Sequence, residues 1–235
     1  MIIRGDEGMK KEKMTILTGF VLLAFFVLFT IIVKTVDVRT VGPQNSPIGL
    51  SGINKWFFDS FGASTLCYYL TEAYGYLSMA VMVSFAGYGL WQLIKGKSFK
   101  KVDTRLWFLA GFYAVVLGCY VFFEKVVINY RPVILDEAEG LEASYPSSHV
   151  VLILCVMGST RVMLSALSVK DKSPLAKAIV LACDIIAITA IVGRLLSGVH
   201  WLTDIFAGIV LSSALVIIFR GVILCISEKE FTKGL

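Results

Sequence analysis

Six long apolar segments constrain this chain more than any other feature, because each is about as long as a lipid bilayer is thick. A helix that crosses the hydrocarbon core needs about 20 predominantly apolar residues, and only helices and closed barrels satisfy their backbone groups there. The sequence therefore predicts an all-α fold, a polytopic six-helix transmembrane bundle in the cell membrane, with residues 1–235 as one membrane-embedded domain. The predicted spans cover about residues 15–35, 69–95, 105–128, 149–168, 175–195 and 202–225.

The composition agrees with a membrane protein and argues against other classes. The chain is 57% hydrophobic, whereas soluble domains have about 45–50% apolar residues. Its first apolar run is too long for a signal peptide and no small-residue cleavage site follows it, so we interpret it as a retained span. The basic residues lie in short loops and form no single patch, so no nucleic-acid partner is expected. The five cysteines show neither metal-ligand spacing nor an obvious disulfide pair, and we interpret them as packing residues.

The distribution of lysine and arginine predicts the orientation in the membrane. Basic residues gather in the N-terminal tail, in the second–third and fourth–fifth connections, and in the C-terminal tail. Cytoplasmic loops carry an excess of such residues, so both termini are expected in the cytoplasm. The other three connections then lie outside the cell, and the chemistry that flanks them is expected on the extracytoplasmic face. The connection between the third and fourth spans is acidic, with Asp136, Glu137, Glu139 and Glu142.

An aromatic-rich segment lies in the first outward connection, over residues 49–64. Trp56, Phe57, Phe58 and Phe61 stand close together there. This pattern is typical of an amphipathic helix in the headgroup layer, or of a lid near a site. A loop that merely packs on the bundle is the alternative.

His200 and Asp204 open the sixth span, and the chain contains only two histidines. Their spacing of four residues places both on one face of a helix. An imidazole held by a carboxylate keeps its other nitrogen free to attack as a nucleophile. Arg194 precedes His200 by six residues, and the short turn between them brings its guanidinium back toward the same site. It then either holds two phosphate oxygens or extends to the lipid headgroups.

Two further clusters lie beside the third and fourth spans. In Pro146-Ser147-Ser148-His149, either serine can cap the following helix, whose N-terminus is a ready anion site. His149 then either donates a proton to a leaving oxygen or has no catalytic role. In Tyr130-Arg131-Pro132 the proline is expected to end the third span and to turn Arg131 toward the mouth of the bundle. Arg131 and Lys125 then contact phosphate or anchor the helix at the interface.

These clusters, in this order, resemble the type 2 phosphatidic acid phosphatase family. Its motifs are a lysine, six residues and Arg-Pro; then Pro-Ser-Gly-His; then Ser-Arg, five residues, a histidine, three residues and an aspartate. The third motif matches at Arg194, His200 and Asp204, and the second at Pro146, Ser147 and His149. This chain departs from the family in three places. Glu124 takes the lysine position one residue before Lys125, Ser148 replaces the glycine, and Gly193 replaces the serine.

The resemblance implies a mechanism for each matched residue. His200 attacks phosphorus and forms a phosphohistidine, Asp204 orients it, and His149 protonates the leaving group and later activates water. The phosphate oxygens are held by Arg131, Arg194, Ser147, the backbone near Ser148, and Lys125. No metal and no cofactor is implied; the acidic residues of the third–fourth connection form either a metal cluster or a solvated loop.

The implied function is hydrolysis of a lipid phosphate or diphosphate at the outer leaflet, with the lipid and the bilayer as partners. A polyprenyl diphosphate, phosphatidic acid or phosphatidylglycerol phosphate each fits as substrate. Transfer of the phosphoryl group or phospho-headgroup to another alcohol is one alternative. A non-enzymatic lipid-binding or transport protein is another. The vanadate-dependent haloperoxidases share the motifs but are soluble. The oligomeric state is unknown from the sequence.

Arg161 and Asp184 lie deep inside the fourth and fifth predicted spans. At about 1.5 Å of rise per residue, both are roughly 15–18 Å below the outer surface. Unpaired charges at that depth are costly, so the sequence predicts an ion pair between the two spans with a structural role. The alternative is that Arg161 extends inward to the interface and Asp184 is protonated.

Overall fold

The computed structural model describes residues 2–138, 140–167 and 173–233, and within these ranges the chain folds into seven α-helices without a β-strand. Six of the helices are long and apolar enough to cross a membrane, which confirms the predicted six-span bundle. The helices are α1 Ile2–Thr35, α2 Ser51–Phe61, α3 Thr65–Gly96, α4 Thr104–Lys125, α5 Ser148–Leu167, α6 Pro174–Leu196 and α7 Leu202–Lys233, with short 3-10 turns at Pro43–Asn45 (η1) and Phe99–Lys101 (η2).

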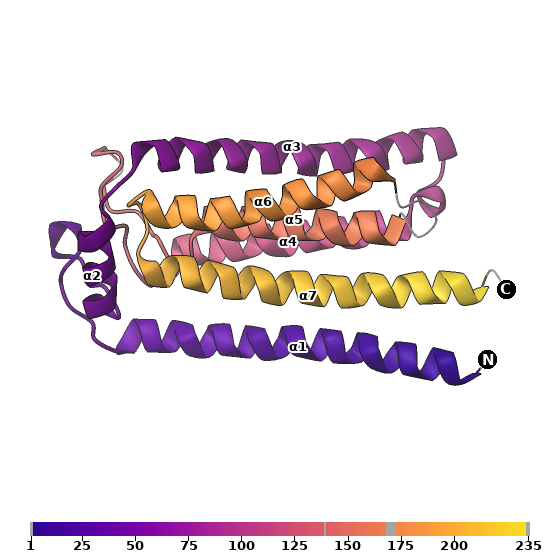
Figure 1. Cartoon of the computed structure of the whole chain (residues 1–235), viewed down its shortest axis with the longest axis horizontal. Helices are drawn as coiled ribbons and strands as arrows, with labels where there is room; N and C mark the ends of the chain where they lie inside the picture. Colours follow the sequence, from indigo (N-terminus) through magenta and orange to yellow (C-terminus); the bar gives the residue numbers. More distant parts are fainter. Residues whose placement is uncertain (1, 139, 168–172, 234–235) are drawn as a thin grey trace.

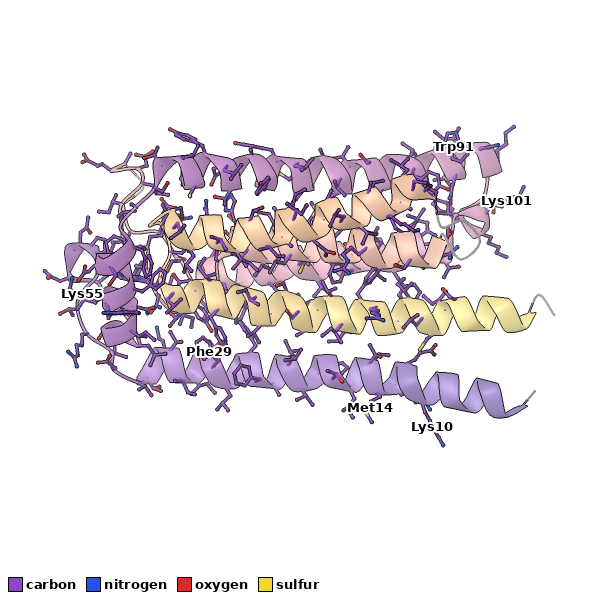
Figure 2. The ribbon with its side chains drawn as sticks, viewed as in Figure 1. Lys10, Met14, Phe29, Lys55, Trp91 and Lys101 are labelled. Carbon is purple, nitrogen blue, oxygen red and sulfur yellow. The ribbon has the colours of Figure 1, made fainter. Side chains whose placement is uncertain are left out.

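α5 is the central helix of the bundle, in contact with α3, α4, α6 and α7. α1 packs along α7 at one edge, and α3 lies at the opposite edge beside α6 (Figure 1). Both termini lie at the end of the bundle opposite α2 (Figure 1). Lys10 and Lys101 lie near that end, whereas Lys55 on α2 marks the other (Figure 2).

Small residues let α5 and α7 approach closely. A Cβ atom at Gly208 would lie 3.0 Å from Cγ1 of Val150, and one at Gly158 would lie 2.8 Å from Cγ2 of Val216. Helices inside a bilayer associate largely through such close packing, because lipid tails are as apolar as leucine. The contact fixes the start of α5 against the start of α7, where His149 and His200 lie.

The end of α4 differs from the prediction. The helix ends at Lys125 rather than near residue 128, so Arg131 does not directly follow a span. Val126, Val127 and Ile128 are apolar but β-branched, which favours extended backbone. The chain then folds back on itself: the N–H of Arg131 donates to the carbonyl of Glu142, and Tyr130 forms an antiparallel bridge with Ala143. Arg131 is therefore held by this folded-back connection.

The aromatic-rich segment contains a helix, as predicted. α2 lies across one end of the bundle (Figure 1) and packs against α7. Its Trp56 and Phe61 are exposed, whereas Asn54 is fully buried. The ring of Phe58 lies 5.7 Å from that of Trp201. A position in the headgroup layer stays a prediction.

The predicted ion pair between Arg161 and Asp184 is confirmed. Nη1 of Arg161 on α5 lies 2.6 Å from Oδ1 of Asp184 on α6. The two side chains are 50% and 36% exposed on the surface of the bundle. Since both belong to candidate membrane spans, the pair neutralises two charges that face the bilayer.

We expect Asp184→Asn to lower the midpoint of thermal unfolding in detergent. The substitution leaves Arg161 without its partner, and a charged residue at the centre of a membrane helix costs about 2.5–3.5 kcal/mol. The double variant Arg161→Gln with Asp184→Asn is the control, and it should recover part of the loss. An Asp184→Asn protein as stable as the parent would show that the pair has no structural role.

Candidate active site

The predicted site residues other than Lys125 come together at the end of the bundle that carries α2. This is where α3, α5 and α7 begin and where α4 and α6 end (Figure 1). Nη2 of Arg194 lies 3.1 Å from Nδ1 of His149. The N–H of Ser147 donates to the backbone carbonyl of Asp204 over 3.0 Å, which ties the start of α5 to the start of α7.

His200 is buried, with one ring nitrogen bound and the other unpaired. Its Nδ1 lies 3.1 Å from the backbone carbonyl of Ser144. A carbonyl only accepts hydrogen bonds, so Nδ1 carries the proton and Nε2 keeps its lone pair. Nε2 is buried without a hydrogen-bond partner among the described residues. This is the tautomer that a nucleophilic histidine requires.

Asp204 lies 3.7 Å from Nδ1 of His200, farther than the carbonyl of Ser144. Its carboxylate accepts hydrogen bonds from the N–H of Trp201 and from Nδ2 of Asn129, at 2.9 Å and 3.3 Å. Asp204 therefore fixes the turn that carries His200, and the Ser144 carbonyl is the nearer group that sets the direction of the ring.

Two buried asparagines support this arrangement and were not predicted. Asn129 accepts from the N–H of Gly49, and its backbone carbonyl accepts from both the N–H and the hydroxyl of Ser144. Asn54 of α2 binds both the N–H and the hydroxyl of Thr203. These hydrogen bonds connect segments far apart in the sequence, so sequence spacing could not have revealed them.

The surroundings of His200 favour its neutral form. Burial lowers the pKa of His200 well below its usual value, and the charges of Arg131 and Arg194 lower this pKa further. The imidazole is therefore unprotonated at neutral pH and available as a nucleophile.

Arg194 is buried in the last turn of α6, with 1% of its surface exposed, so it does not extend to the headgroups. Nη1 donates to the hydroxyl of Thr71 and to Oε1 of Glu72, at 3.1 Å and 3.0 Å. A Cβ atom at Gly193 would lie 2.9 Å from Cγ2 of Thr71. Thr71 of α3 thus fills the space of a serine side chain at position 193 and binds the arginine itself.

Glu72 was missed by the sequence analysis, although its position gave a usable signal. It is an acidic residue inside a candidate membrane span, and an ionisable residue there is by default a functional candidate. Its Oε1 lies 3.0 Å from both Nη1 of Arg194 and Nε2 of His149.

Arg131 forms an ion pair with Glu142. Like Glu72, Glu142 had no predicted role in phosphate binding. Nε of Arg131 lies 2.9 Å from Oε2 of Glu142, so the two side chains form an ion pair. The direction of the Nε–H bond does not meet the criteria of a hydrogen bond.

Ser147 precedes the first residue of α5, and its backbone carbonyl accepts from the N–H of Val151. Its hydroxyl makes no capping bond and is buried without a partner in the described chain.

Ser148 and Lys125 differ in their relation to the site. Ser148 is the first residue of α5 and, with His149, lines a cavity of about 830 Å³, the main cavity. Lys125 is exposed and lies outside the set of cavity-lining residues, whereas Glu124 lines the cavity. The phosphate-binding role of Lys125 therefore stays a prediction without a contact to support it.

No group of three or more His, Cys, Asp or Glu side chains that could hold a metal ion occurs among the described residues. Of the acidic third–fourth connection, Glu139 lies outside those residues, and Glu142 binds Arg131. The five cysteines are free.

The main cavity of about 830 Å³ lies beside the site and is lined mostly by residues of α3, α4, α5 and the connection between α4 and α5. Its polar end is lined by Glu72, Arg131 and His149. Its other end is lined by apolar residues such as Met79, Met82 and Leu211. Glu72 and Met82 are ten residues apart on α3, or about 15 Å along the helix. The cavity therefore has the polarity of an amphiphile, with a charged end and an apolar end.

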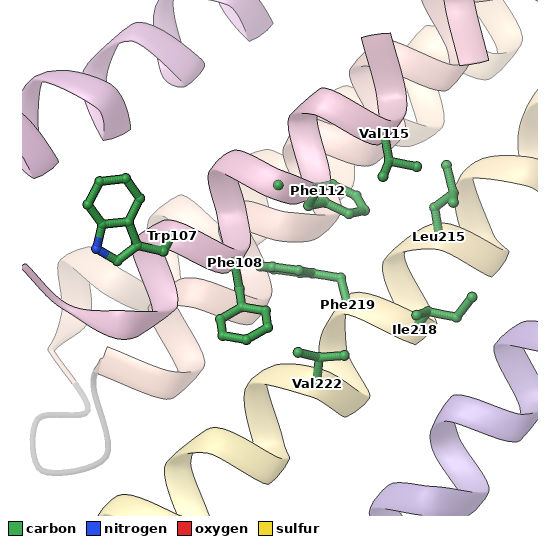
Figure 3. Close-up of a pocket in the computed structure, with 9 residues that line it drawn as sticks. Trp107, Phe108, Phe112, Val115, Leu215, Ile218, Phe219 and Val222 are labelled. Atoms are coloured by element: carbon green, nitrogen blue, oxygen red, sulfur yellow. The ribbon is translucent and has the colours of Figure 1, made fainter. Parts of the chain in front are cut away.

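A smaller cavity of about 380 Å³ lies between α4 and α7. Figure 3 shows Phe108 and Phe112 of α4 facing Phe219 and Val222 of α7, whereas the ring of Trp107 points away from α7. No ionisable side chain and none of the predicted site residues lines this cavity. It therefore offers no groups for the chemistry considered above.

Fold and site together define a multi-pass membrane protein with two histidines and two arginines gathered at one end of its bundle. A family model described as the PAP2 superfamily matches residues 105–225, just over half of the chain. The chain belongs to the PAP2 superfamily. The matched segment runs from α4 to α7 and contains all the residues of the three motifs.

One solved structure supports the fold. It is the crystal structure of the first transmembrane PAP2 type phosphatidylglycerolphosphate phosphatase from Bacillus subtilis. The alignment has a TM-score of 0.58 and 16% sequence identity, and it covers 90% of this chain and 96% of that chain. No match was found among curated proteins.

The lowered pKa of His200 predicts how stability depends on pH. The unfolded chain takes up a proton below about pH 6.5, whereas folded His200 stays neutral there. The folded state should therefore lose up to about 1.4 kcal/mol per pH unit from this group as the pH falls below 6.5. Thermal unfolding of the parent and of His200→Asn, measured from pH 8 to 5, checks this. Parallel curves for the two proteins would contradict it.

Proposed function

We propose that this protein is an integral-membrane phosphatase that hydrolyses a lipid phosphate or diphosphate, through a phosphohistidine at His200 and without a metal cofactor. One observation carries the proposal. Four buried polar atoms without a hydrogen-bond partner in the described structure belong to predicted site residues: Nη1 of Arg131, Oγ of Ser147, Nε of Arg194 and Nε2 of His200. Buried polar groups are nearly always hydrogen-bonded, so the three donors fit the oxygens of a bound anion, while the lone pair of Nε2 is free to attack its phosphorus.

Each residue then has a role that its geometry supports. Nε2 of His200 attacks phosphorus, while the Ser144 carbonyl orients the ring and Asp204 fixes the turn that carries it. Arg131 and Arg194 bind the phosphate oxygens and stabilise the charge of the transition state. The hydroxyl of Ser147 and the N–H of Ser148, at the start of α5, donate hydrogen bonds to the same oxygens.

His149 acts on the leaving group and then on water. In the first step the imidazolium gives its proton to the leaving oxygen as the P–O bond breaks. In the second step the neutral imidazole takes a proton from water, which attacks phosphorus and releases His200. Because Nη2 of Arg194 lies 3.1 Å from Nδ1 of His149, the ring already lies beside the phosphate-binding arginine.

The cavity supports a lipid as the substrate. Its charged end suits a phosphate and its apolar end an acyl or prenyl chain. We propose that the lipid enters from the extracytoplasmic leaflet. This orientation rests on the basic residues of the tails and of two connections. Both termini are at the opposite end from the site (Figure 1) and therefore lie in the cytoplasm.

We expect the parent to release phosphate from one or more of phosphatidic acid, phosphatidylglycerol phosphate and a polyprenyl diphosphate in detergent with chelator present. His200→Asn should lower this rate about 10⁴-fold or more, because the nucleophile is lost. An acid-labile phosphoenzyme should form in the parent but not in His200→Asn. The control Glu137→Gln, in an exposed loop, should behave as the parent.

Other outcomes identify the alternatives. New phospholipid formed on adding glycerol, in place of free phosphate, would indicate transfer to an alcohol. Binding of a lipid phosphate by folded protein without release or a phosphoenzyme would indicate a lipid-binding protein. Loss of release on adding chelator would contradict a metal-independent reaction.

The cavity makes a second prediction. Met79→Trp should raise KM about tenfold for a long-chain lipid phosphate, because the larger ring occupies space for the chain. It should leave hydrolysis of p-nitrophenyl phosphate, which has no chain, unchanged. Met14→Trp is the matched control, since Met14 is exposed on α1 (Figure 2). Equal effects on both substrates would show that the chain does not bind in this cavity.

A further inference from the structure

Glu72 is the one acidic residue in direct contact with both His149 and Arg194 in the described structure. It lies on α3, outside the segment that the family model matches. The side chain is 25% exposed and lines the polar end of the main cavity. α3 therefore brings to the site a carboxylate that none of the three motifs contains.

The contacts of Glu72 determine how His149 is protonated. Nη2 of Arg194 lies 3.1 Å from Nδ1 of His149, and a guanidinium only donates hydrogen bonds, so Nδ1 accepts. The proton of the neutral ring is then on Nε2, 3.0 Å from Oε1 of Glu72. The same carboxylate oxygen accepts from Nη1 of Arg194 at 3.0 Å. The three side chains form a closed set in which Glu72 holds the ring from one side.

The packing of α3 supports this arrangement. Gly75 lies one turn after Glu72, and a Cβ atom there would be 3.2 Å from Cδ2 and 3.4 Å from Nε2 of His149. The absence of a side chain at Gly75 lets the imidazole lie against the backbone of α3, within reach of Glu72. The position of His149 thus depends on two residues of α3.

We propose that Glu72 is a positioning residue for the general acid His149, an inference that rests on the proposed function. Glu72 binds Nε2–H throughout the reaction and stabilises the imidazolium. When phosphate binds, Nη2 of Arg194 turns to a phosphate oxygen, and Nδ1 takes up a proton from the surrounding solution and faces the leaving group. Nδ1 gives its proton to the leaving oxygen as the P–O bond breaks and the bond from phosphorus to Nε2 of His200 forms. Nδ1 takes a proton from water when that bond is hydrolysed.

The leaving group of the substrate tests this role. An alkoxide leaving from phosphatidic acid needs a proton, whereas p-nitrophenolate leaves without one near neutral pH. Glu72→Gln keeps the size and one hydrogen-bond acceptor but removes the charge. In the first turnover, with protein in excess, this variant should cleave phosphatidic acid about tenfold or more slowly, within the contribution of general acid catalysis. Its release of p-nitrophenolate should stay within about threefold of the parent.

Thr71→Val is the matched control. It removes the Thr71 hydroxyl, which accepts a hydrogen bond from Nη1 of Arg194, and leaves the contact between Glu72 and His149 in place. If Thr71 acts only through phosphate binding, this variant raises KM for both substrates to the same extent. Gly75→Ala is a second probe, because it crowds His149 and keeps the charge of Glu72. It should reproduce the selective loss with phosphatidic acid, even if Glu72→Gln does not fold.

Three results would overturn the proposal. Equal slowing of both substrates by Glu72→Gln would show that Glu72 acts only through Arg194. A lower KM without slowing would show that the carboxylate merely occupies the place of the phosphate. An unselective Gly75→Ala would show that the contact with α3 does not position the acid. Failure of the parent to cleave either substrate or to form a phosphoenzyme would instead overturn the proposed function itself.

Discussion

The buried carboxylate of Asp204 is the group on which the site end of the bundle depends. It accepts from the N–H of Trp201 and from Asn129, and the backbone carbonyl of the same residue accepts from Ser147. These bonds join α7, the connection after α4 and the start of α5. A buried charge is tolerated only when it is well hydrogen-bonded, so the requirements of one carboxylate fix three segments that carry site residues.

The bilayer made the spans predictable, and local backbone preferences limited that prediction. Apolar length alone placed most helix ends within a few residues, because a membrane helix must match the thickness of the hydrocarbon core. α4 was predicted too long, because Val126, Val127 and Ile128 are as apolar as a span but favour extended backbone. The ion pair of Arg161 with Asp184 was predictable because the cost of charge in lipid leaves few alternatives.

Part of the site was predictable for a different reason. His200 and Asp204 lie on one turn of chain, and Arg194 is separated from them by a single tight turn, so sequence spacing fixes their proximity. Ser144, Asn54 and Glu72 reach the site through contacts between segments far apart in the sequence. Such contacts depend on which helices are neighbours, and the bundle of this chain does not follow sequence order: α1 packs on α7, and α3 on α6.

Two ion pairs stabilise the arginines of the site. Arg194 is paired with Glu72 and Arg131 with Glu142. A buried guanidinium without a counter-charge is costly, and Arg194 is almost completely buried. A phosphate brings its own negative charge, so it competes with the glutamates for the same donors or shares them. Glu72 also binds His149, so it keeps this contact when a phosphate binds Arg194. Glu142 has a described ion pair with Arg131 alone. Once phosphate is bound, Glu72 therefore still positions His149, whereas Glu142 only shares or loses its contact with Arg131.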